Sequence, residues 1–305
     1  MRVSSEWVIC GLMRLSKTLQ ISEFVVGFCV MAAAGSLPNL FLGITSALDG
    51  IPELSLGDVF GNNFVAMTLA VAIAIMFSPK KEIEAGGKTI QSTAVFMMIT
   101  ALLPIALLFD GVLSRFDGII LIGLFVGYLL WLFLKQDKSG RIYHHEKDPP
   151  FLLALLRQEF RDICTVLLGI VSLVAASIGI VNAAHFFAES LGVPVLLVGL
   201  LVTGLGNALP EIYFAIASAR RGETQLIIGN LMGSVIVPAT FVLGLVAIIH
   251  PITSNSYIFA VNSRVYLLIA TILFFIFTKS KEKISYSEGV ILMFLYLVFV
   301  FDVIF

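Results

Sequence analysis

Long apolar runs dominate this 305-residue chain and decide what it can fold into. A helix that spans a bilayer needs about 20 consecutive, mostly apolar residues. Nine runs come close to this length or exceed it, and they cover residues 21–47, 57–78, 91–110, 117–134, 162–188, 194–219, 226–249, 261–278 and 287–305. A shorter tenth run covers residues 3–16. Only 13% of the residues are charged, against about 25% in soluble domains. The sequence therefore predicts an all-α membrane protein with ten transmembrane helices and excludes a soluble enzyme.

One fragment of the sequence occurs twice. The stretch Ala34–Asp58 in the first half of the chain matches the stretch Gly206–Asn230 in the second half without a gap. The copies and the residues that follow them share Leu-Pro at 37–38 and 209–210, serine at 46 and 218, and glycine at 50 and 222, 57 and 229, and 61 and 233. The acidic residues differ, because Asn39 aligns with Glu211 and Asp58 aligns with Asn230.

The repeat divides the chain into two halves of five spans each. We predict a first repeat over residues 1–134, a cytoplasmic linker over 135–160 and a second repeat over 161–305. An odd number of spans per half makes the repeats insert with opposite orientation, which is typical of many secondary transporters. Met1 aligns with Leu173, inside the corresponding span of the second half, so the first helix is expected to be abbreviated.

Basic residues indicate the orientation in the membrane. With ten spans and the N-terminus outside, all 19 Lys and Arg residues except Arg2, Arg115 and Arg264 fall in or beside the cytoplasmic connections. Cytoplasmic loops of membrane proteins carry an excess of Lys and Arg. We therefore predict an integral multi-pass protein with both termini outside.

Carboxylates inside apolar runs are the candidate functional groups. Glu211 directly follows Pro210, and proline within a helix removes a hydrogen bond, which predicts a break in the span at this point. A charge at the bilayer centre costs at least about 2.5 kcal/mol, so it marks a functional site by default. Asp58 and Asn62 lie one helical turn apart, as do Asn230 and Ser234, and each pair shares a helical face. Together these oxygens could surround a cation such as calcium, which takes 6–8 oxygen ligands.

Other metal chemistry is not indicated. The cysteines at 10, 29 and 164 lie in apolar surroundings without a CxxC pair, so they predict neither a zinc site nor a disulfide framework. His144 and His145 lie in the polar linker, and we interpret them as a solvated pair.

The two fragments resemble the pattern GTS-x-PE…GN-x-x-GS, which occurs in both halves of the cation/calcium exchangers, and the resemblance extends over essentially the whole chain. This resemblance implies ten helices with two broken, tilted pairs, which are 21–47 with 57–78 and 194–219 with 226–249. It also implies a central calcium site flanked by sodium sites, and these sites open alternately to the two sides of the membrane. No cofactor is implied, and the expected location is the cell membrane of a prokaryote.

The chain departs from the family pattern at several site positions. Asn39 stands where the first repeat of the family has a calcium-binding glutamate, and Asn62 stands where it has serine. Ala66 and Pro238 occupy positions that usually carry Asn or Asp ligands. Asp58, which replaces an asparagine of the family, could restore the second carboxylate. The predicted ligands are Glu211, Asp58, Asn39, Asn62, Asn207, Asn230, Ser234 and Ser36.

We therefore expect a secondary antiporter that exchanges calcium for sodium by alternating access. The loss of the first-repeat glutamate leaves two alternatives open. One is an antiporter for a monovalent cation or for protons, and the other is a degenerate member of the family that does not transport.

Overall fold

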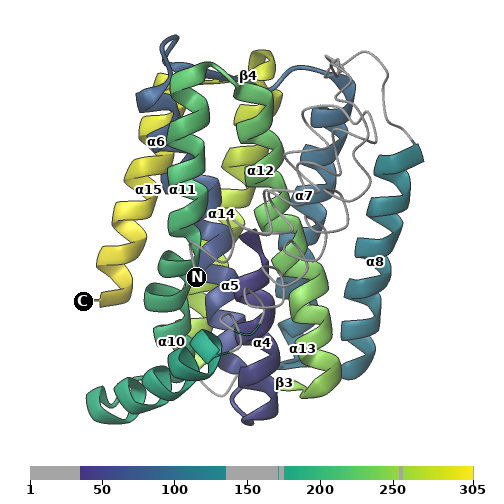
Figure 1. Ribbon diagram of the computed structural model, residues 1–305, viewed down its shortest axis with the longest axis vertical. Coiled ribbons are helices and arrows are strands. Elements are labelled where there is room, and N and C mark those ends of the chain that lie inside the picture. The colour runs from purple at the N-terminus through teal and green to yellow at the C-terminus, as the bar shows by residue number, and fades with distance from the viewer. Residues whose placement is uncertain (1–34, 135–170, 172–174, 254–256, 305) are drawn as a thin grey trace, which may run out of the picture.

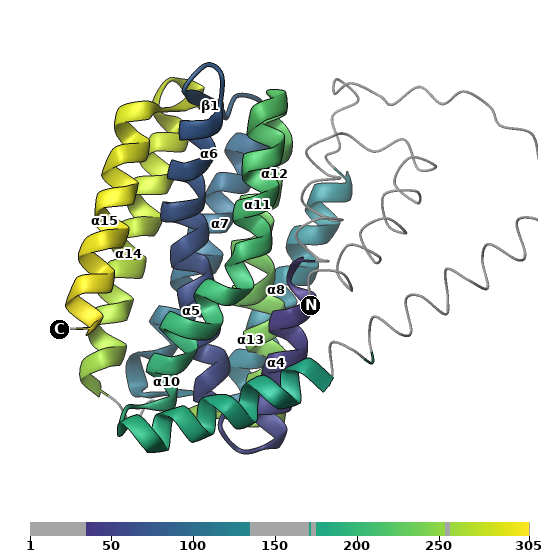
Figure 2. The same cartoon turned by 60° about the vertical axis from the view of Figure 1, so that its left-hand side comes forward.

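A computed structural model of the chain describes residues 35–134, 171, 175–253 and 257–304. Long helices run roughly parallel to the longest axis of the molecule, and the helix at 175–191 lies across its lower end (Figures 1 and 2). The predicted span 3–16, the linker 135–160 and most of the predicted span 162–188 lie outside the described residues.

The elements of the first half follow in a simple order. They are α4 (Leu37–Leu48), α5 (Glu53–Val65), the π-helical stretch η2 (Ala66–Ala70), α6 (Val71–Phe77), β1 (Glu82–Glu84), α7 (Lys88–Leu107), the short 3-10 turn η3 (Leu108–Asp110), β2 (Val112–Leu113) and α8 (Arg115–Leu134).

The elements of the second half repeat this order. They are α10 (Val195–Val198), the π-helical stretch η4 (Gly199–Thr203), α11 (Gly204–Arg221), α12 (Thr224–Val237), the π-helical stretch η5 (Pro238–Val242), α13 (Leu243–Ile249), β3 (Ile252–Thr253), α14 (Tyr257–Lys279), the short 3-10 turn η6 (Ser280–Glu282), β4 (Lys283–Ser285) and α15 (Tyr286–Ile304).

The sequence repeat reappears in the structure. The stretches η2 and η5 occupy equivalent positions of the two copies, as do α6 and α13. Strand β1 pairs with β4 and strand β2 pairs with β3, both antiparallel, at opposite ends of the bundle (Figure 1). Each half thus contributes one strand to each end, and the two halves are joined at both ends.

Seven helices of the described residues are long and apolar enough to cross a membrane. They are Glu53–Phe77, Lys88–Asp110, Arg115–Leu132, Val195–Arg221, Thr224–Ile249, Ser263–Glu282 and Tyr286–Val303. Each begins and ends within a few residues of a predicted span. Of the predicted span 21–47, the structure describes the shorter apolar helix Leu37–Leu48. The count of ten helices remains a prediction.

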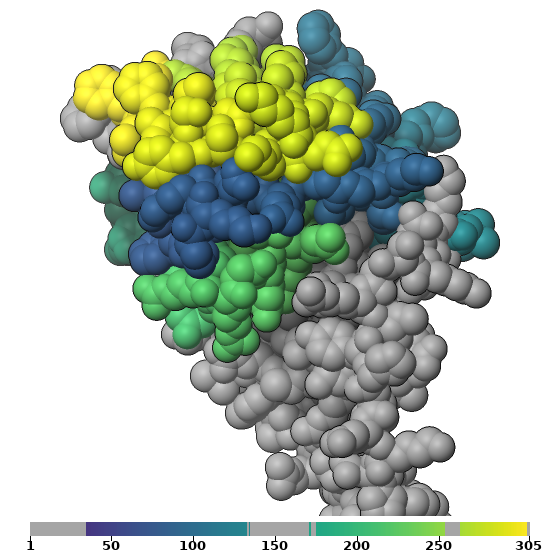
Figure 3. Space-filling model, turned by 90° about the horizontal axis from the view of Figure 1, so that it is seen from above, coloured from purple at the N-terminus to yellow at the C-terminus, as the bar shows by residue number. Residues whose placement is uncertain are grey.

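The spans form layers with different surroundings. Seen from above, α14 and α15 form one layer, α6 and α7 the next, and α11 and α12 a third (Figure 3). The spans Glu53–Phe77 and Thr224–Ile249 bury 83% and 78% of their most apolar windows, whereas Arg115–Leu132 and Tyr286–Val303 bury 22% each. The first two spans therefore form the core of the protein, and the outer helices present their apolar side chains to lipid.

Glycines bring the two halves into backbone contact. A Cβ atom added to Gly57 would lie 2.1 Å from the Leu196 carbonyl oxygen, and one added to Gly61 would lie 2.0 Å from that of Leu200. From the other side, a Cβ on Gly199 would lie 2.4 Å from the Leu54 oxygen. Small residues permit this approach between membrane helices. Helix α5 of the first half is thereby fixed against α10, η4 and α11 of the second half.

The predicted break at Pro210 is wrong. Helix α11 runs through Pro210 without interruption, and the departure from α-helical geometry lies earlier, at Gly199–Thr203. Proline costs a helix one hydrogen bond, but the surrounding turns can keep their geometry. The widened turn instead coincides with the segment that packs against α5. In the first half, Pro38 lies in the first turn of α4, where a proline costs no hydrogen bond.

The two polar ends of the bundle differ in charge. The β1–β4 end, comprising residues 78–88, 220–224 and 279–288, carries eight basic and five acidic residues. The β2–β3 end, comprising residues 49–53, 109–117, 189–194 and 250–253, carries one Arg and five acidic residues.

Candidate cation-binding site

The site begins where α5 meets α11. The side chain of Asn207 on α11 donates a hydrogen bond of 2.8 Å from Nδ2 to Oδ1 of Asp58 on α5. Asp58 is fully buried and Asn207 is almost fully buried. The close packing of Gly57 and Gly61 on the other half positions Asp58, which lies between these glycines in the sequence. Asp58 therefore points toward the second half of the chain, as its proposed role requires.

Glu211 lies one helical turn beyond Asn207 and is also buried. A Cβ atom on Gly35 would lie 2.7 Å from Oε1 of Glu211, so the carboxylate reaches the residue that precedes Ser36 at the start of α4. A side chain at position 35 would displace the end of the Glu211 side chain from this position. Asp58 lies close enough to Glu211 to act on it electrostatically. The structure thus brings together two carboxylates, one from each half.

Several oxygen atoms around these carboxylates lack a hydrogen-bond donor. Within the described part of the chain, no donor reaches Asp58 Oδ2, Glu211 Oε2, Asn39 Oδ1 or Asn62 Oδ1. None of these four residues is more than 3% exposed. A buried polar atom without a partner costs free energy, and a buried charge without a counter-charge costs more. Neither carboxylate forms an ion pair with a described residue. A bound cation would satisfy these oxygen atoms and neutralise the charge.

Asn62 connects the two halves at equivalent positions of the repeat. Its Nδ2 donates a hydrogen bond of 3.1 Å to the backbone carbonyl of Ser234, 172 residues away. This bond leaves the side-chain oxygen of Asn62 as the free acceptor. The hydroxyl of Ser234 donates to the Leu231 carbonyl and keeps its lone pairs. Asn62 and Ser234 are therefore in contact and buried.

The remaining predicted residues differ in the atoms that they leave without a hydrogen-bond partner. Asn39 and Ser36 on the α4 side are buried, as a ligand role requires. The unpaired atom of Asn230 is its amide nitrogen, a donor, so in this arrangement that group cannot bind a cation. Ala66 and Pro238 are the first residues of η2 and η5 and lie buried among apolar neighbours.

The sequence reasoning missed Thr203. Its side chain lies beside the Asp58 carboxylate, and its hydroxyl donates a hydrogen bond of 2.9 Å to the Gly199 carbonyl. With that proton engaged, the Thr203 oxygen can act as a further acceptor toward a cation. The signal was present, because Thr203, Asn207 and Glu211 follow one another at intervals of four residues and so share a helical face.

Ser55 and Asn63 on α5 were also missed. Both are buried, and neither Ser55 Oγ nor Asn63 Oδ1 makes a hydrogen bond within the described residues. Ser55, Asp58 and Asn62 lie at spacings of three and four, so they form a polar stripe along one face of α5.

The donor set is rich in neutral oxygen atoms. The described residues contain no group of three or more His, Cys, Asp and Glu side chains that could hold a metal ion. A site here would combine the two carboxylates with amide, hydroxyl and backbone oxygens. These are the ligands of hard cations such as sodium and calcium, whereas zinc and copper prefer nitrogen and sulfur.

Comparison with known proteins gives consistent matches. A family model described as sodium/calcium exchanger protein matches residues 1–134 and 162–305. The inner membrane protein YrbG of Escherichia coli is 26% identical over 280 residues, which cover 91% of this chain and 85% of that relative. The sodium/calcium exchanger MaX1 of Methanosarcina acetivorans is 25% identical over 329 residues, which cover 97% and 93%.

A solved structure shows the same fold. The sodium-calcium exchanger NCX_Mj, in crystals soaked with sodium and strontium ions, matches with a TM-score of 0.70. The match covers 97% of this chain and 92% of that one, at 22% sequence identity. The chain therefore has the all-helical membrane transporter fold of that protein.

Proposed function

Because this chain belongs to the sodium/calcium exchanger protein family, we propose that it exchanges calcium for sodium across the membrane in which it is embedded. The family is one of ion antiporters rather than enzymes, and the ions are its transported substrates. The protein is an integral multi-pass membrane protein. The proposal concerns the ions and the residues that bind them.

One observation carries the proposal. Asp58 and Glu211, from different halves of the chain, are buried beside oxygen atoms that lack donors. Two carboxylates balance the charge of one divalent ion. Sodium ions in the same region would compete for the same oxygens. The proposed ligands are Glu211, Asp58, Asn39, Asn62, Asn207, Ser36 and Ser234, with Thr203 added from the structure. Asn230 is the remaining predicted ligand and would bind through its amide oxygen.

The arrangement of the chain supports alternating access. We propose two inverted repeats of five helices, over 1–134 and 161–305, joined by a linker at 135–160. The recurrence of η2 and η5, and the exchange of strands between the halves at both ends, agree with this organisation. We propose that the β1–β4 end is cytoplasmic, because it carries the excess of basic residues that the positive-inside rule associates with that side. Helix α15 runs from there toward the opposite end, so the C-terminus is proposed to lie outside (Figure 1).

The second candidate is an antiporter for a monovalent cation or for protons. It is favoured by the neutral residues Asn39, Ala66 and Pro238, which leave only two carboxylates in the region. Two carboxylates suffice for one divalent ion but give it less charge than a site with three or four. The choice between the candidates is therefore a question of measured ion selectivity.

Transport by the reconstituted protein tests the proposal. Purified protein in proteoliposomes loaded with sodium should take up radioactive calcium when the outer sodium is removed. Two unit charges 4 Å apart interact by about 4 kcal/mol at an effective dielectric constant of about 20. Removal of one charge should therefore lower calcium uptake at low calcium at least about tenfold. We expect this loss in Glu211→Gln and in Asp58→Asn.

Glu189→Gln is the matched control, because Glu189 is an exposed carboxylate far from the site in sequence. It should transport like the wild type. Full calcium uptake by Glu211→Gln would contradict the assigned site. Exchange of sodium for protons without calcium uptake, abolished by Glu211→Gln, would establish the second candidate in place of the first.

A further inference from the structure

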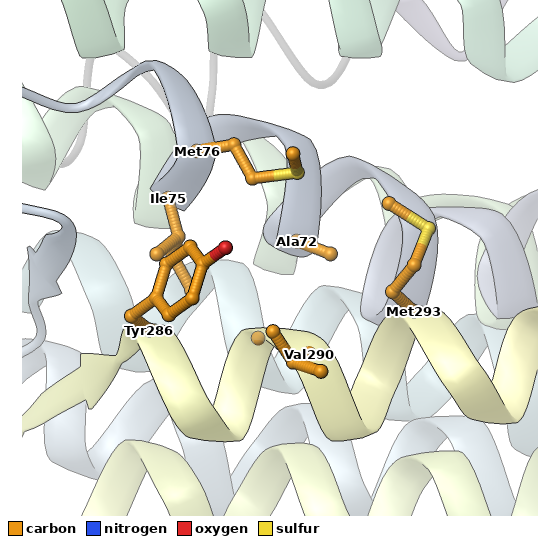
Figure 4. A pocket seen from close by; sticks show the side chains of 7 residues that line it. Ala72, Ile75, Met76, Tyr286, Val290 and Met293 are labelled. Atoms are coloured by element: carbon orange, nitrogen blue, oxygen red, sulfur yellow. The ribbon is translucent and has the colours of Figure 1, made fainter.

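A crevice opens on the outer surface between α6 and α15. Its lining residues come from the last turns of α6 and the first two turns of α15, and include Ala72, Met76, Tyr286, Gly289, Val290 and Met293 (Figure 4). Its volume is about 200 Å³. Apart from the hydroxyl of Tyr286, every lining side chain is apolar.

Gly289 lets the two helices approach at the base of the crevice. A Cβ atom on Gly289 would lie 2.9 Å from Cδ1 of Ile75, so α15 lies directly against α6 there. Met76, Tyr286 and Val290 are each about half exposed and flank the opening. Since α15 is among the least buried spans, the crevice faces the hydrocarbon of the bilayer. An apolar crevice in this position can accommodate an acyl chain without the burial of any unpaired polar group.

A cation lies at the polar end of this crevice. The ammonium group of Lys81 donates a hydrogen bond to the backbone carbonyl of Met76, a lining residue. Lys81 is exposed and forms no ion pair within the described residues. Its neighbour Lys80 is instead paired with Glu84 at 2.8 Å, and Lys283 with Glu82 at 2.7 Å. Lys81 is thus a cation at the crevice that has no acidic partner among the described residues.

The β1–β4 end, in which Lys81 lies, carries more basic than acidic residues. The β1–β4 end carries eight basic and five acidic residues, and three of those acidic residues already have partners: Glu82 with Lys283, Glu84 with Lys80, and Glu288 with the amide and hydroxyl of Ser285. Arg220 lies 4.9 Å above the ring of Phe77, at the end of α6. A negative group at the crevice mouth would therefore meet a positive field.

From these observations we propose that the crevice binds an anionic phospholipid. One acyl chain lies between α6 and α15 from Tyr286 to Met293, and the phosphate lies against the ammonium group of Lys81. Tyr286, whose ring separates the apolar crevice from the polar end, contributes a hydroxyl at the boundary (Figure 4). The proposal needs only membrane insertion and does not depend on which ions are exchanged.

Native mass spectrometry of the detergent-purified protein tests this site. The protein is titrated with phosphatidylglycerol or phosphatidylcholine carrying the same acyl chains. The first tight lipid should favour phosphatidylglycerol about fivefold, the effect expected for one well-placed basic residue at a membrane surface. Lys81→Gln should remove this preference. Lys80→Gln, which makes the same change of charge one residue away, should keep it.

A second pair of variants tests the acyl chain. Val290→Trp fills the crevice from an exposed position and should lower binding of both lipids at this site. Val298→Trp, on the same helix but outside the crevice, should bind like the wild type. The lysine pair remains decisive if Val290→Trp does not fold.

Several outcomes would overturn the proposal. These are equal binding of the two phospholipids by the wild type, equal effects of the two lysine substitutions, and unchanged lipid binding by a folded Val290→Trp. Displacement of the lipid by the same concentration of inorganic phosphate would show a surface anion site without an acyl chain. A dimer that Val290→Trp converts to a monomer would assign the crevice to a second copy of the chain.

Discussion

Replacement of Gly61 by alanine should separate the two halves of the protein at the ion site. An alanine Cβ would lie 2.0 Å from the Leu200 carbonyl oxygen, whereas ordinary van der Waals contact begins at 3.4 Å. Helix α5 and the stretch η4 must therefore move apart by the difference between these two distances. The obstructing atom belongs to the backbone, so no side-chain rotation can relieve the clash.

The same movement reaches the candidate ligands. The Asn207–Asp58 hydrogen bond joins α5 to α11, which continues directly from η4, at 2.8 Å. If α11 moves with η4, a separation of this size would stretch the bond beyond hydrogen-bonding distance. Overpacking costs about 1–3 kcal/mol, against a gain of at most about 1 kcal/mol from the better helix propensity of alanine. The net cost is therefore up to about 2 kcal/mol, and Gly61→Ala should lower the melting temperature by about 2 °C for each kcal/mol in a chain of this length.

Gly206→Ala is the matched control, since a Cβ atom at this exposed position of α11 would meet nothing within 4 Å. It makes the same chemical change and should be neutral or slightly stabilising. Thermal unfolding in detergent and calcium uptake in proteoliposomes measure both variants. If Gly61→Ala melts at or above the temperature of Gly206→Ala and transports normally, the backbone contact between the halves is refuted.

Three further predictions concern polar contacts. Asn207→Ala should reduce cation uptake at least about tenfold at low cation concentration, because it removes both an oxygen ligand and the donor to Asp58. Asn62→Ala should weaken transport and lower the melting temperature, because Asn62 links the two halves through its 3.1 Å bond. Glu84 raises the pKa of Lys80 above its ordinary value of 10.5, through a hydrogen bond and through its charge. Any contribution of this pair to the stability of the folded protein is complete below about pH 10.5, the ordinary pKa of lysine. The contribution is lost as the pH rises through the raised pKa. Glu84→Gln should lower this pKa in an NMR titration, and the melting temperature should not change because the pair is exposed.

The extent and periodicity of the apolar runs predicted the described helices well. Spans such as 226–249 and 287–305 differ by only a few residues from the helices that the structure contains. The physical reason is that lipid imposes one length and one composition on every spanning helix. The alignment of the two copies carried further information, since it also relates η2 to η5, which no composition rule would have found.

Local backbone geometry was predicted less well. Proline at 210 suggested a break, yet the widened turn lies at Gly199–Thr203. A proline removes one donor, and a helix tolerates this loss when its neighbours hold it in place. The position of a π-helical stretch is instead set by packing, here by the contacts of Gly199 and Gly204 with α5. Such contacts join residues from different halves of the chain, and no local pattern in one sequence shows them.

The eight ligands predicted from the sequence are all buried, but the sequence did not show how their side chains pair. Thr203, Ser55 and Asn63 are buried as well, as are polar residues outside the candidate site such as Ser46 and Ser218. The sequence could not show that Asn207 donates to Asp58, because the equivalent positions in the opposite halves carry Gly35 and Asn230. An interaction that occurs in only one of the two repeats cannot be found by comparing the sequences of the two copies.

The two carboxylates are distributed asymmetrically over the repeats. In a symmetric site, equivalent positions of the two repeats would carry equivalent charges, and α4 and α11 would each bear a carboxylate. Here both carboxylates, Asp58 and Glu211, belong to α5 and α11, which are held together by backbone contacts. The α4 and α12 sides contribute the neutral amides of Asn39 and Asn230. A cation would then be held by the charged side chains of α5 and α11, with neutral ligands on the α4 and α12 sides.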